Sequence, residues 1–238
     1  MQIELIPAID VIDGKCVRLT QGDYGSKKVY HDNPVEVARE FAGYGFRRLH
    51  VVDLDGAKSQ HVVNHKVVEA IRSATDLVID FGGGVKSDED LQKAFDAGAS
   101  MVTVGSLAVK EPETFLRWLG QYGSSRIILG ADMKNGLVSI NGWKEEGSPL
   151  LPFVQNYVEQ GVKKVLCTDI SKDGMLQGPA IGLYQQLMQR FPTLHLIASG
   201  GVSSIDDILA LDAAGIPAVV FGKAIYEGRI HLPDLMKA

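Results

Sequence analysis

Residues 78–85 read Val-Ile-Asp-Phe-Gly-Gly-Gly-Val, a short hydrophobic run that ends in glycines. Ser87 follows, with acidic residues at the next three positions, as is typical where a serine caps the start of a helix. The same arrangement recurs around Gly200-Gly201, 117 residues after Gly83-Gly84. Because this distance is about half of the 238 residues, the sequence predicts a chain built from two equivalent halves.

Eight hydrophobic runs recur along the chain, and most end in a polar residue or a glycine. Their residues are hydrophobic at successive positions, as in parallel strands that are buried on both faces. Helical patterns lie between most of them, for example the segment that begins with Asn33 and Pro34. The expected strands are Leu5–Ile9, Arg48–Val52, Leu77–Phe81, Met101–Val104, Ile127–Ala131, Val165–Cys167, Leu194–Ala198 and Ala218–Phe221.

Eight strands that alternate with helices predict an α/β fold, the (β/α)8 TIM barrel, for which about 250 residues are typical. An open, doubly wound sheet is the alternative, but two equivalent halves of four strands favour a closed barrel. We expect one barrel domain over residues 1–238, with half-barrels at about 1–122 and 123–238.

Two connections are longer than the others: Val11–Asn33 after the first expected strand and Met133–Pro149 after the fifth. They occupy equivalent places in the two halves. Long connections in compact domains are often functional, so we expect both to lie over an active site.

Composition excludes several classes of function. The net charge of −5 gives no basic face for nucleic acid, and no hydrophobic run approaches the roughly 18 residues of a membrane span. The N-terminus has no features of a signal peptide. Cys16 and Cys167 match no metal-binding spacing. We therefore expect a cytoplasmic protein with reduced thiols, no metal, and no nucleic-acid or membrane partner.

Aspartates stand where expected strands end, which is where catalytic residues lie in TIM barrels. Asp10 follows the first strand and Asp132 the fifth, at equivalent places in the two halves. Two carboxyl groups across a barrel mouth can serve as general acid and general base. Asp53 and Asp169 also end strands, but we interpret them as structural residues that bind backbone groups.

The two glycine pairs have a second interpretation besides tight turns. Consecutive glycines let backbone N–H groups approach an anion, and a following helix N-terminus adds positive potential. A ligand with a phosphate at each end would occupy one such site in each half. The predicted phosphate-binding residues are Gly83, Gly84, Gly105 and Ser106 in the first half, and Gly200, Gly201, Gly222 and Lys223 in the second.

Seven segments of this sequence match, in order, those of one protein family. They are residues 6–10, 17–24, 52–57, 82–87, 141–143, 168–174 and 199–202. On these segments the chain resembles, along essentially its whole length, the phosphoribosylformimino-aminoimidazole-carboxamide ribotide isomerases of histidine biosynthesis. The resemblance implies a (β/α)8 barrel that needs no cofactor and binds a small-molecule substrate with two phosphates. We expect a monomer.

The resemblance also implies a reaction, the Amadori rearrangement of an aminoaldose to an aminoketose. Asp10 would be the proton acceptor. The proton donor would be Asp132, by the symmetry of the halves, or Asp173, in the segment after the sixth strand. Thr168 would bind near the reacting atoms. The residues expected to bind the rest of the substrate are Arg18, Gly22, Trp143 and Ser199.

Three other functions stay open. One is the cyclase subunit that makes imidazole glycerol phosphate, although that family typically has Cys-Leu-Asp where this chain has Ala8-Ile9-Asp10. Another is a dual-substrate isomerase that also acts on phosphoribosyl anthranilate. The third is a phosphosugar-binding barrel without catalysis, against which the intact Asp10, Asp132 and Asp173 argue.

Overall fold

The computed structural model describes residues 1–140 and 145–238. In it, eight parallel strands form a closed ring, because β1 (Glu4–Ile12) pairs with the last strand, β12 (Ala218–Phe221), as well as with β4 (Arg48–Asp53). The predicted (β/α)8 barrel is confirmed, and all eight expected strands overlap observed ones. The ring continues through β5 (Val78–Gly82), β6 (Met101–Val104), β7 (Ile127–Lys134), β10 (Lys164–Asp169) and β11 (His195–Ser199).

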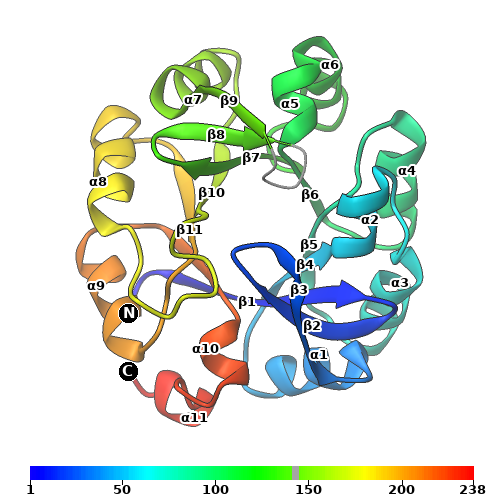
Figure 1. Cartoon of the computed structure of the whole chain (residues 1–238), viewed down its shortest axis with the longest axis vertical. Helices are drawn as coiled ribbons and strands as arrows, with labels where there is room; N and C mark the ends of the chain where they lie inside the picture. The colour runs from blue at the N-terminus through cyan, green and yellow to red at the C-terminus, as the bar shows by residue number, and fades with distance from the viewer. Residues whose placement is uncertain (141–144) are drawn as a thin grey trace.

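Helices surround this ring (Figure 1). Polar side chains cap three of them as the sequence predicts: Asn33, Ser87 and Ser204 each accept a hydrogen bond from a backbone N–H of the first turn. The longer helices are α1 (Pro34–Gly43), α3 (His65–Ala74), α4 (Asp88–Asp96), α6 (Pro112–Tyr122), α7 (Leu150–Glu159), α8 (Ile181–Arg190) and α9 (Ile205–Ala213). Short helices are α2 (Leu54–Ser59), α5 (Ser106–Lys110), α10 (Lys223–Tyr226) and α11 (Leu232–Leu235).

Each of the two long connections contains two further strands, which the sequence does not predict. The first contains β2 (Lys15–Thr20) and β3 (Asp23–His31), and the second contains β8 (Leu137–Ile140) and β9 (Glu145–Pro149). Each pair continues a barrel strand as an antiparallel ribbon. The turns Asp13-Gly14 and Asn135-Gly136 have positive φ at both residues, as a two-residue type I′ turn requires.

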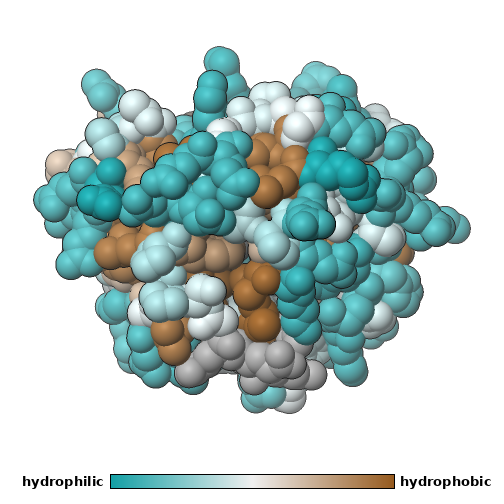
Figure 2. Space-filling view, turned by 90° about the horizontal axis from the view of Figure 1, so that it is seen from above, coloured by the Kyte–Doolittle hydropathy of each residue, from teal (hydrophilic) through white to brown (hydrophobic). Residues whose placement is uncertain are grey.

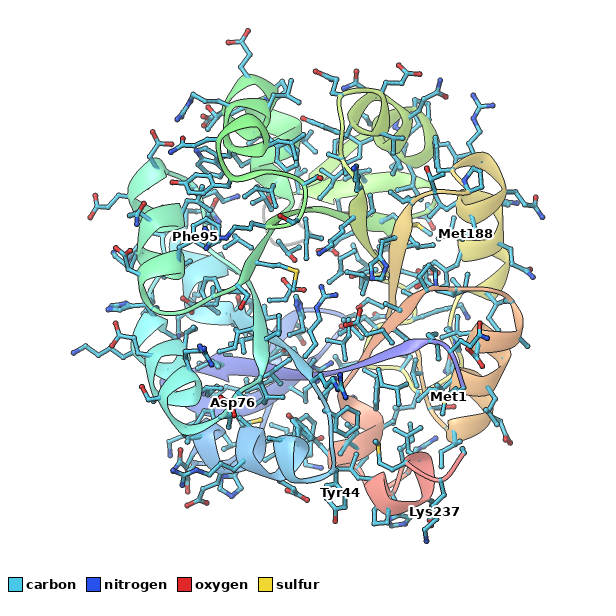
Figure 3. All side chains as sticks on the ribbon, turned by 180° about the vertical axis from the view of Figure 1, so that it is seen from behind. Met1, Tyr44, Asp76, Phe95, Met188 and Lys237 are labelled. Carbon is cyan, nitrogen blue, oxygen red and sulfur yellow. The ribbon has the colours of Figure 1, made fainter. Side chains whose placement is uncertain are left out.

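Side chains lie inside the ring as well as outside it (Figure 3), and hydrophobic ones form a core in both places. The outer core packs the strands against the helices and includes the fully buried Trp118, Phe115 and Tyr157. The inner core consists of Ile6, Ala8, Met101, Ile128, Leu166, Ile197, Ala218 and Val220. These residues pack closely inside the ring, as side chains do in the interior of a TIM barrel.

Hydrophilic residues cover most of the face shown in Figure 2, with hydrophobic residues in patches between them. Within residues 1–140 and 145–238, no helix has the length and hydrophobicity needed to cross a bilayer.

Candidate active site

A cavity of about 230 Å³ lies at the carboxyl ends of the barrel strands. It collects residues from both halves of the sequence, which the chain brings together by closing the ring. The predicted site residues that line it are Asp10, Arg18, Gly22, Gly83, Gly84, Gly105, Ser106, Asp132, Thr168, Asp173 and Ser199. A smaller cavity of about 30 Å³ shares Arg18, Asp173 and Ser199 with it and is also lined by Gly200, Gly201, Gly222 and Lys223. Trp143 lies outside the described residues.

Asp10 lies near the end of β1, beside Val17 of β2 and Val52 of β4. Its Oδ2 atom is 2.9 Å from Nη1 of Arg18, and the two side chains are 14% and 11% exposed. Burial raises the pKa of the Asp10 carboxyl, and the charges of Arg18 and His50 oppose that rise. The guanidinium of Arg18 therefore favours the ionised form of Asp10 at a place where burial disfavours it.

Asp173 is a second carboxyl group in the same cavity. Its backbone N–H donates to the carbonyl of Asp169, which holds the segment after β10 in a turn. The pKa of Asp173 is raised to about 6: burial is the largest cause, the charges of Asp10 and Asp132 add to the rise, and those of Arg18 and Lys223 oppose it. Two carboxyl groups that share a poorly solvated space do not both ionise readily, so this site favours one charged and one protonated group.

The glycine segments have a clear packing role. A Cβ atom on Gly83 would lie 2.2 Å from the carbonyl oxygen of Asp53, and one on Gly201 would lie 2.3 Å from that of Gly178. Both glycines also have positive φ, near +98° and +89°. The tight-turn interpretation therefore holds, and it is compatible with an anion site because both segments line the cavities.

Asp53 and Asp169 are structural, as predicted. Asp53 is fully buried, and its carboxylate accepts hydrogen bonds from the backbone N–H groups of Gly56, Val63 and Asn64. The Asp169 carboxylate accepts from the backbone and the hydroxyl of Ser171. At the ends of their strands, these two carboxylates thus hold the following loops by hydrogen bonds. Neither of them lines the two cavities.

Lys223 joins three elements above the smaller cavity. Its ammonium donates to the hydroxyl of Thr20 at 3.0 Å and to the carbonyl of Gly174 at 2.7 Å. The neighbouring Gly222 leaves space for Arg18, because a Cβ there would lie 3.0 Å from its Nη1. Lys223 therefore lies where a phosphate-binding group is expected, and these two bonds use two of the three N–H donors of its ammonium.

The family model for histidine biosynthesis proteins matches residues 4–231. The chain belongs to this family. A relative from Bacteroides thetaiotaomicron is 64% identical over 234 residues, 98% of both chains, and one from Phocaeicola vulgatus is 65% identical over the same span. A third, from Parabacteroides distasonis, is 60% identical over 236 residues, 99% of both chains. All three are named 1-(5-phosphoribosyl)-5-((5-phosphoribosylamino)methylideneamino)imidazole-4-carboxamide isomerase.

The protein is thus an isomerase of histidine biosynthesis.

Its cavity also contains a lysine that was not predicted from the sequence as a site residue. Lys86 lines the larger cavity beside Gly84, Gly105 and Ser106. Burial lowers the pKa of its ammonium, and the nearby positive charge of Lys110 lowers it further. A half-buried lysine beside another lysine gains by binding an anion. Its position just before Ser87, which caps a helix, is the feature of the sequence that could have indicated an anion-binding role.

Proposed function

We propose that the protein catalyses the Amadori rearrangement of the phosphoribosylformimino aminoaldose, ProFAR, to the aminoketose, PRFAR, by general acid–base catalysis. The observation that carries the proposal is the convergence of Asp10, Asp132 and Asp173 on one cavity. The full-length relatives named as this isomerase support the choice of substrate. Removing the carboxyl groups should therefore abolish turnover without abolishing binding.

The two ends of the site match a substrate with two phosphates. One end has Lys86 beside the glycine segment of β5, and the other has Lys223 beside that of β11. Backbone N–H groups and a lysine together are the usual partners of a phosphate. The substrate would lie across the barrel mouth with its sugar over the carboxyl groups. Thr168, Ser199 and Gly22 would contact it between the two ends.

The reaction needs a proton acceptor and a proton donor. The donor gives a proton to the ring oxygen of the aminoaldose while the C1–O bond breaks, which leaves a protonated imine at C1. The acceptor then removes the proton from C2, and the resulting enolamine becomes the ketone. Asp10 suits the acceptor role because Arg18 and His50 favour its charged form. A catalyst in each role typically contributes about 10²–10⁴ in rate.

We assign the donor role to Asp173. A carboxyl with a pKa of about 6 carries its proton to a higher pH than an ordinary aspartate does, which is what a general acid requires. Asp132 is the alternative that the symmetry of the halves favours, and it also lines the cavity. In this arrangement Asp132 would raise the proton affinity of Asp173 through its charge.

The test is an assay of the purified protein with the aminoaldose ribotide, followed by comparison of three variants. Asp10→Asn should lower kcat by at least about a hundredfold with a small change in KM. Asp173→Asn should have a similar effect and Asp132→Asn a smaller one. An Asp132→Asn variant that loses more activity than Asp173→Asn would exchange the two roles. A wild-type protein that binds the ribotide but does not convert it would overturn the proposal.

A further inference from the structure

One polar side chain of the cavity wall has no role in the mechanism above. Ser139 of β8 lines the larger cavity, and only 8% of the residue is exposed. Within residues 1–140 and 145–238, its hydroxyl makes no hydrogen bond. Burying a hydroxyl without a partner costs free energy, so buried hydroxyls in proteins are usually paired. The partner that this position offers to the hydroxyl is a molecule in the cavity.

The strand directs this hydroxyl toward the cavity. Side chains along a strand alternate between its two faces. The preceding residue, Val138, is 1% exposed and packs in the outer core between strands and helices. Ser139 therefore lies on the opposite face of the ribbon, and this is the face that closes one side of the cavity.

Ser139 stands opposite Asp132 in the ribbon. β7 and β8 pair Met133 with Val138, and one step further in the same register Asp132 faces Ser139. Opposite residues of an antiparallel pair lie on the same face, with their Cβ atoms about 4.5–5.5 Å apart. Both residues line the cavity. The hydroxyl is therefore next to one of the three carboxyl groups over which the sugar would lie.

The first ribbon shows that the fold does not require a hydroxyl at this place. There Val17 pairs with Asp10, shortly after the Asp13-Gly14 turn. Ser139 occupies the same place after the turn of the second ribbon. Val17 is completely buried and packs in a hydrophobic cluster with Ile12. A hydrophobic residue thus suits the ribbon itself, whereas the serine supplies a hydrogen-bond donor at the cavity.

The second ribbon also packs against the helix that begins at the predicted phosphate site of the first half. A Cβ atom on Gly147 of β9 would lie 3.3 Å from Cγ1 of Val109 in α5. The first residue of this helix, Ser106, and the preceding Gly105 line the cavity. Ser139 therefore lies on the side of the cavity where one of the two phosphates of the substrate is expected.

We propose that Ser139 is a substrate-binding residue whose hydroxyl donates a hydrogen bond to an oxygen of the bound ribose phosphate, at the end of the substrate nearest α5. The inference rests on the proposed function for the identity of the ligand. A serine hydroxyl can donate one bond, and sugar and phosphate oxygens accept such bonds. The contact is made before the proton transfers and is retained during them. It should therefore stabilise the bound substrate and the transition state equally, and act on KM.

The test is Ser139→Ala, which removes the hydroxyl and leaves the size of the side chain nearly unchanged. The affinity for the aminoaldose ribotide is measured by calorimetry in the Asp10→Asn background, where turnover should be slow. We expect Kd to rise about three- to tenfold, the usual effect of one lost hydrogen bond. With Asp10 intact, KM should rise by a similar factor while kcat changes by less than about twofold.

Ser125→Ala is the matched control, because it removes an exposed hydroxyl just before the amino end of β7. It should change neither Kd nor KM. An unchanged Kd in Ser139→Ala would overturn the inference and mean that the serine is present for its small size. A lower kcat with an unchanged Kd would also overturn it, because the hydroxyl would then act on Asp132. A wild-type protein that binds the ribotide without converting it would instead refute the proposed function, and the effect of Ser139→Ala on Kd would still test the contact.

Discussion

Arg18 and Asp10 form an ion pair of 2.9 Å at the mouth of the barrel, between two antiparallel strands that the chain makes by folding back on itself. The pair joins a residue expected to bind substrate to the residue expected to remove a proton. It has the consequence that substrate binding and the charge of the base are linked. Whatever attracts the guanidinium away from Asp10 also raises the proton affinity of that carboxyl.

Arg18→Met should therefore lower kcat/KM more at low pH than at high pH. Without the guanidinium the already raised pKa of Asp10 rises further, so the ionised fraction of the base falls more at low pH than at high pH. We expect a loss at pH 6 at least about tenfold greater than at pH 8.5. Lys15→Met, which removes an exposed lysine of the same strand, is the control. Equal losses at both pH values would limit Arg18 to substrate binding.

Asp173→Asn should stabilise the protein at alkaline pH. The pKa of Asp173 is raised to about 6 from 3.8, so its contribution to stability is fully present below pH 3.8 and is lost as pH rises through 6. Asparagine does not titrate, so the variant does not lose this stability as the pH rises. The difference corresponds to at most about 3 kcal/mol, or several degrees in Tm at pH 8, and should be near zero at pH 4. Thermal unfolding at the two pH values measures it.

The exposed Asp76→Asn variant serves as the control for that experiment, and it should have the same Tm as the wild type at both pH values. A Tm gain for Asp173→Asn that is the same at pH 4 and pH 8 would mean that the carboxyl does not titrate in this range. The pH-dependent gain would also show that the site retains Asp173 for function at a cost in stability.

The β2–β3 ribbon and the segment that carries Asp173 are held together at their tips. The Gln21 side chain donates to the carbonyl of Ser171 at 3.0 Å, and its backbone N–H donates to that of Asp173 at 3.2 Å. Gln21→Ala combined with Thr20→Val removes the direct bond to Ser171 and the bond that Thr20 accepts from Lys223, whose ammonium also donates to Gly174 of the segment. We expect kcat to fall roughly three- to tenfold, since each bond contributes about 1 kcal/mol to the closed arrangement.

Hydrogen exchange gives an independent measurement of that loosening. Amides of residues 170–178 should exchange faster in the double variant, while those of the barrel strands should not change. Gln92→Ala removes a surface bond to Asp96 and provides the control. Unchanged exchange over 170–178 together with normal kcat would mean that the ribbon and the segment are positioned independently.

The barrel could be predicted because its strands are buried on both faces and its helices have local caps. Such signals survive in a single sequence, since they depend on neighbouring residues. The two ribbons were not predicted, although the sequence contains dipeptides typical of hairpin turns at Asp13-Gly14 and Asn135-Gly136. β3 contains many exposed polar residues and β8 has only four residues, so the turn dipeptides are the clearest mark of the ribbons in the sequence.

The site was predictable where a residue ends a strand and less so elsewhere. Asp10 and Asp132 follow from barrel topology, because strand ends meet at one face. The approach of Asp173 to Asp10 depends on how a turn folds over the barrel, which no local pattern shows. His50 stands within a hydrophobic run and resembles a core residue in sequence. Its contact with Asp80 depends on the register between β4 and β5, which the sequence alone does not show.

Gly83→Ala should destabilise the protein far more than a comparable change elsewhere. The new methyl group would overlap the Asp53 carbonyl, and the backbone would keep a φ near +98° that disfavours side chains. Overlap and strain together should lower the free energy of unfolding by roughly 2–4 kcal/mol. Gly136→Ala is the matched control, because its φ is also positive but no atom lies within 4 Å, so it should cost only about 1 kcal/mol. Urea unfolding of both variants measures the difference. Equal losses would mean that the Asp53 loop can move away, and Gly83 would then be retained for the anion site and not for packing.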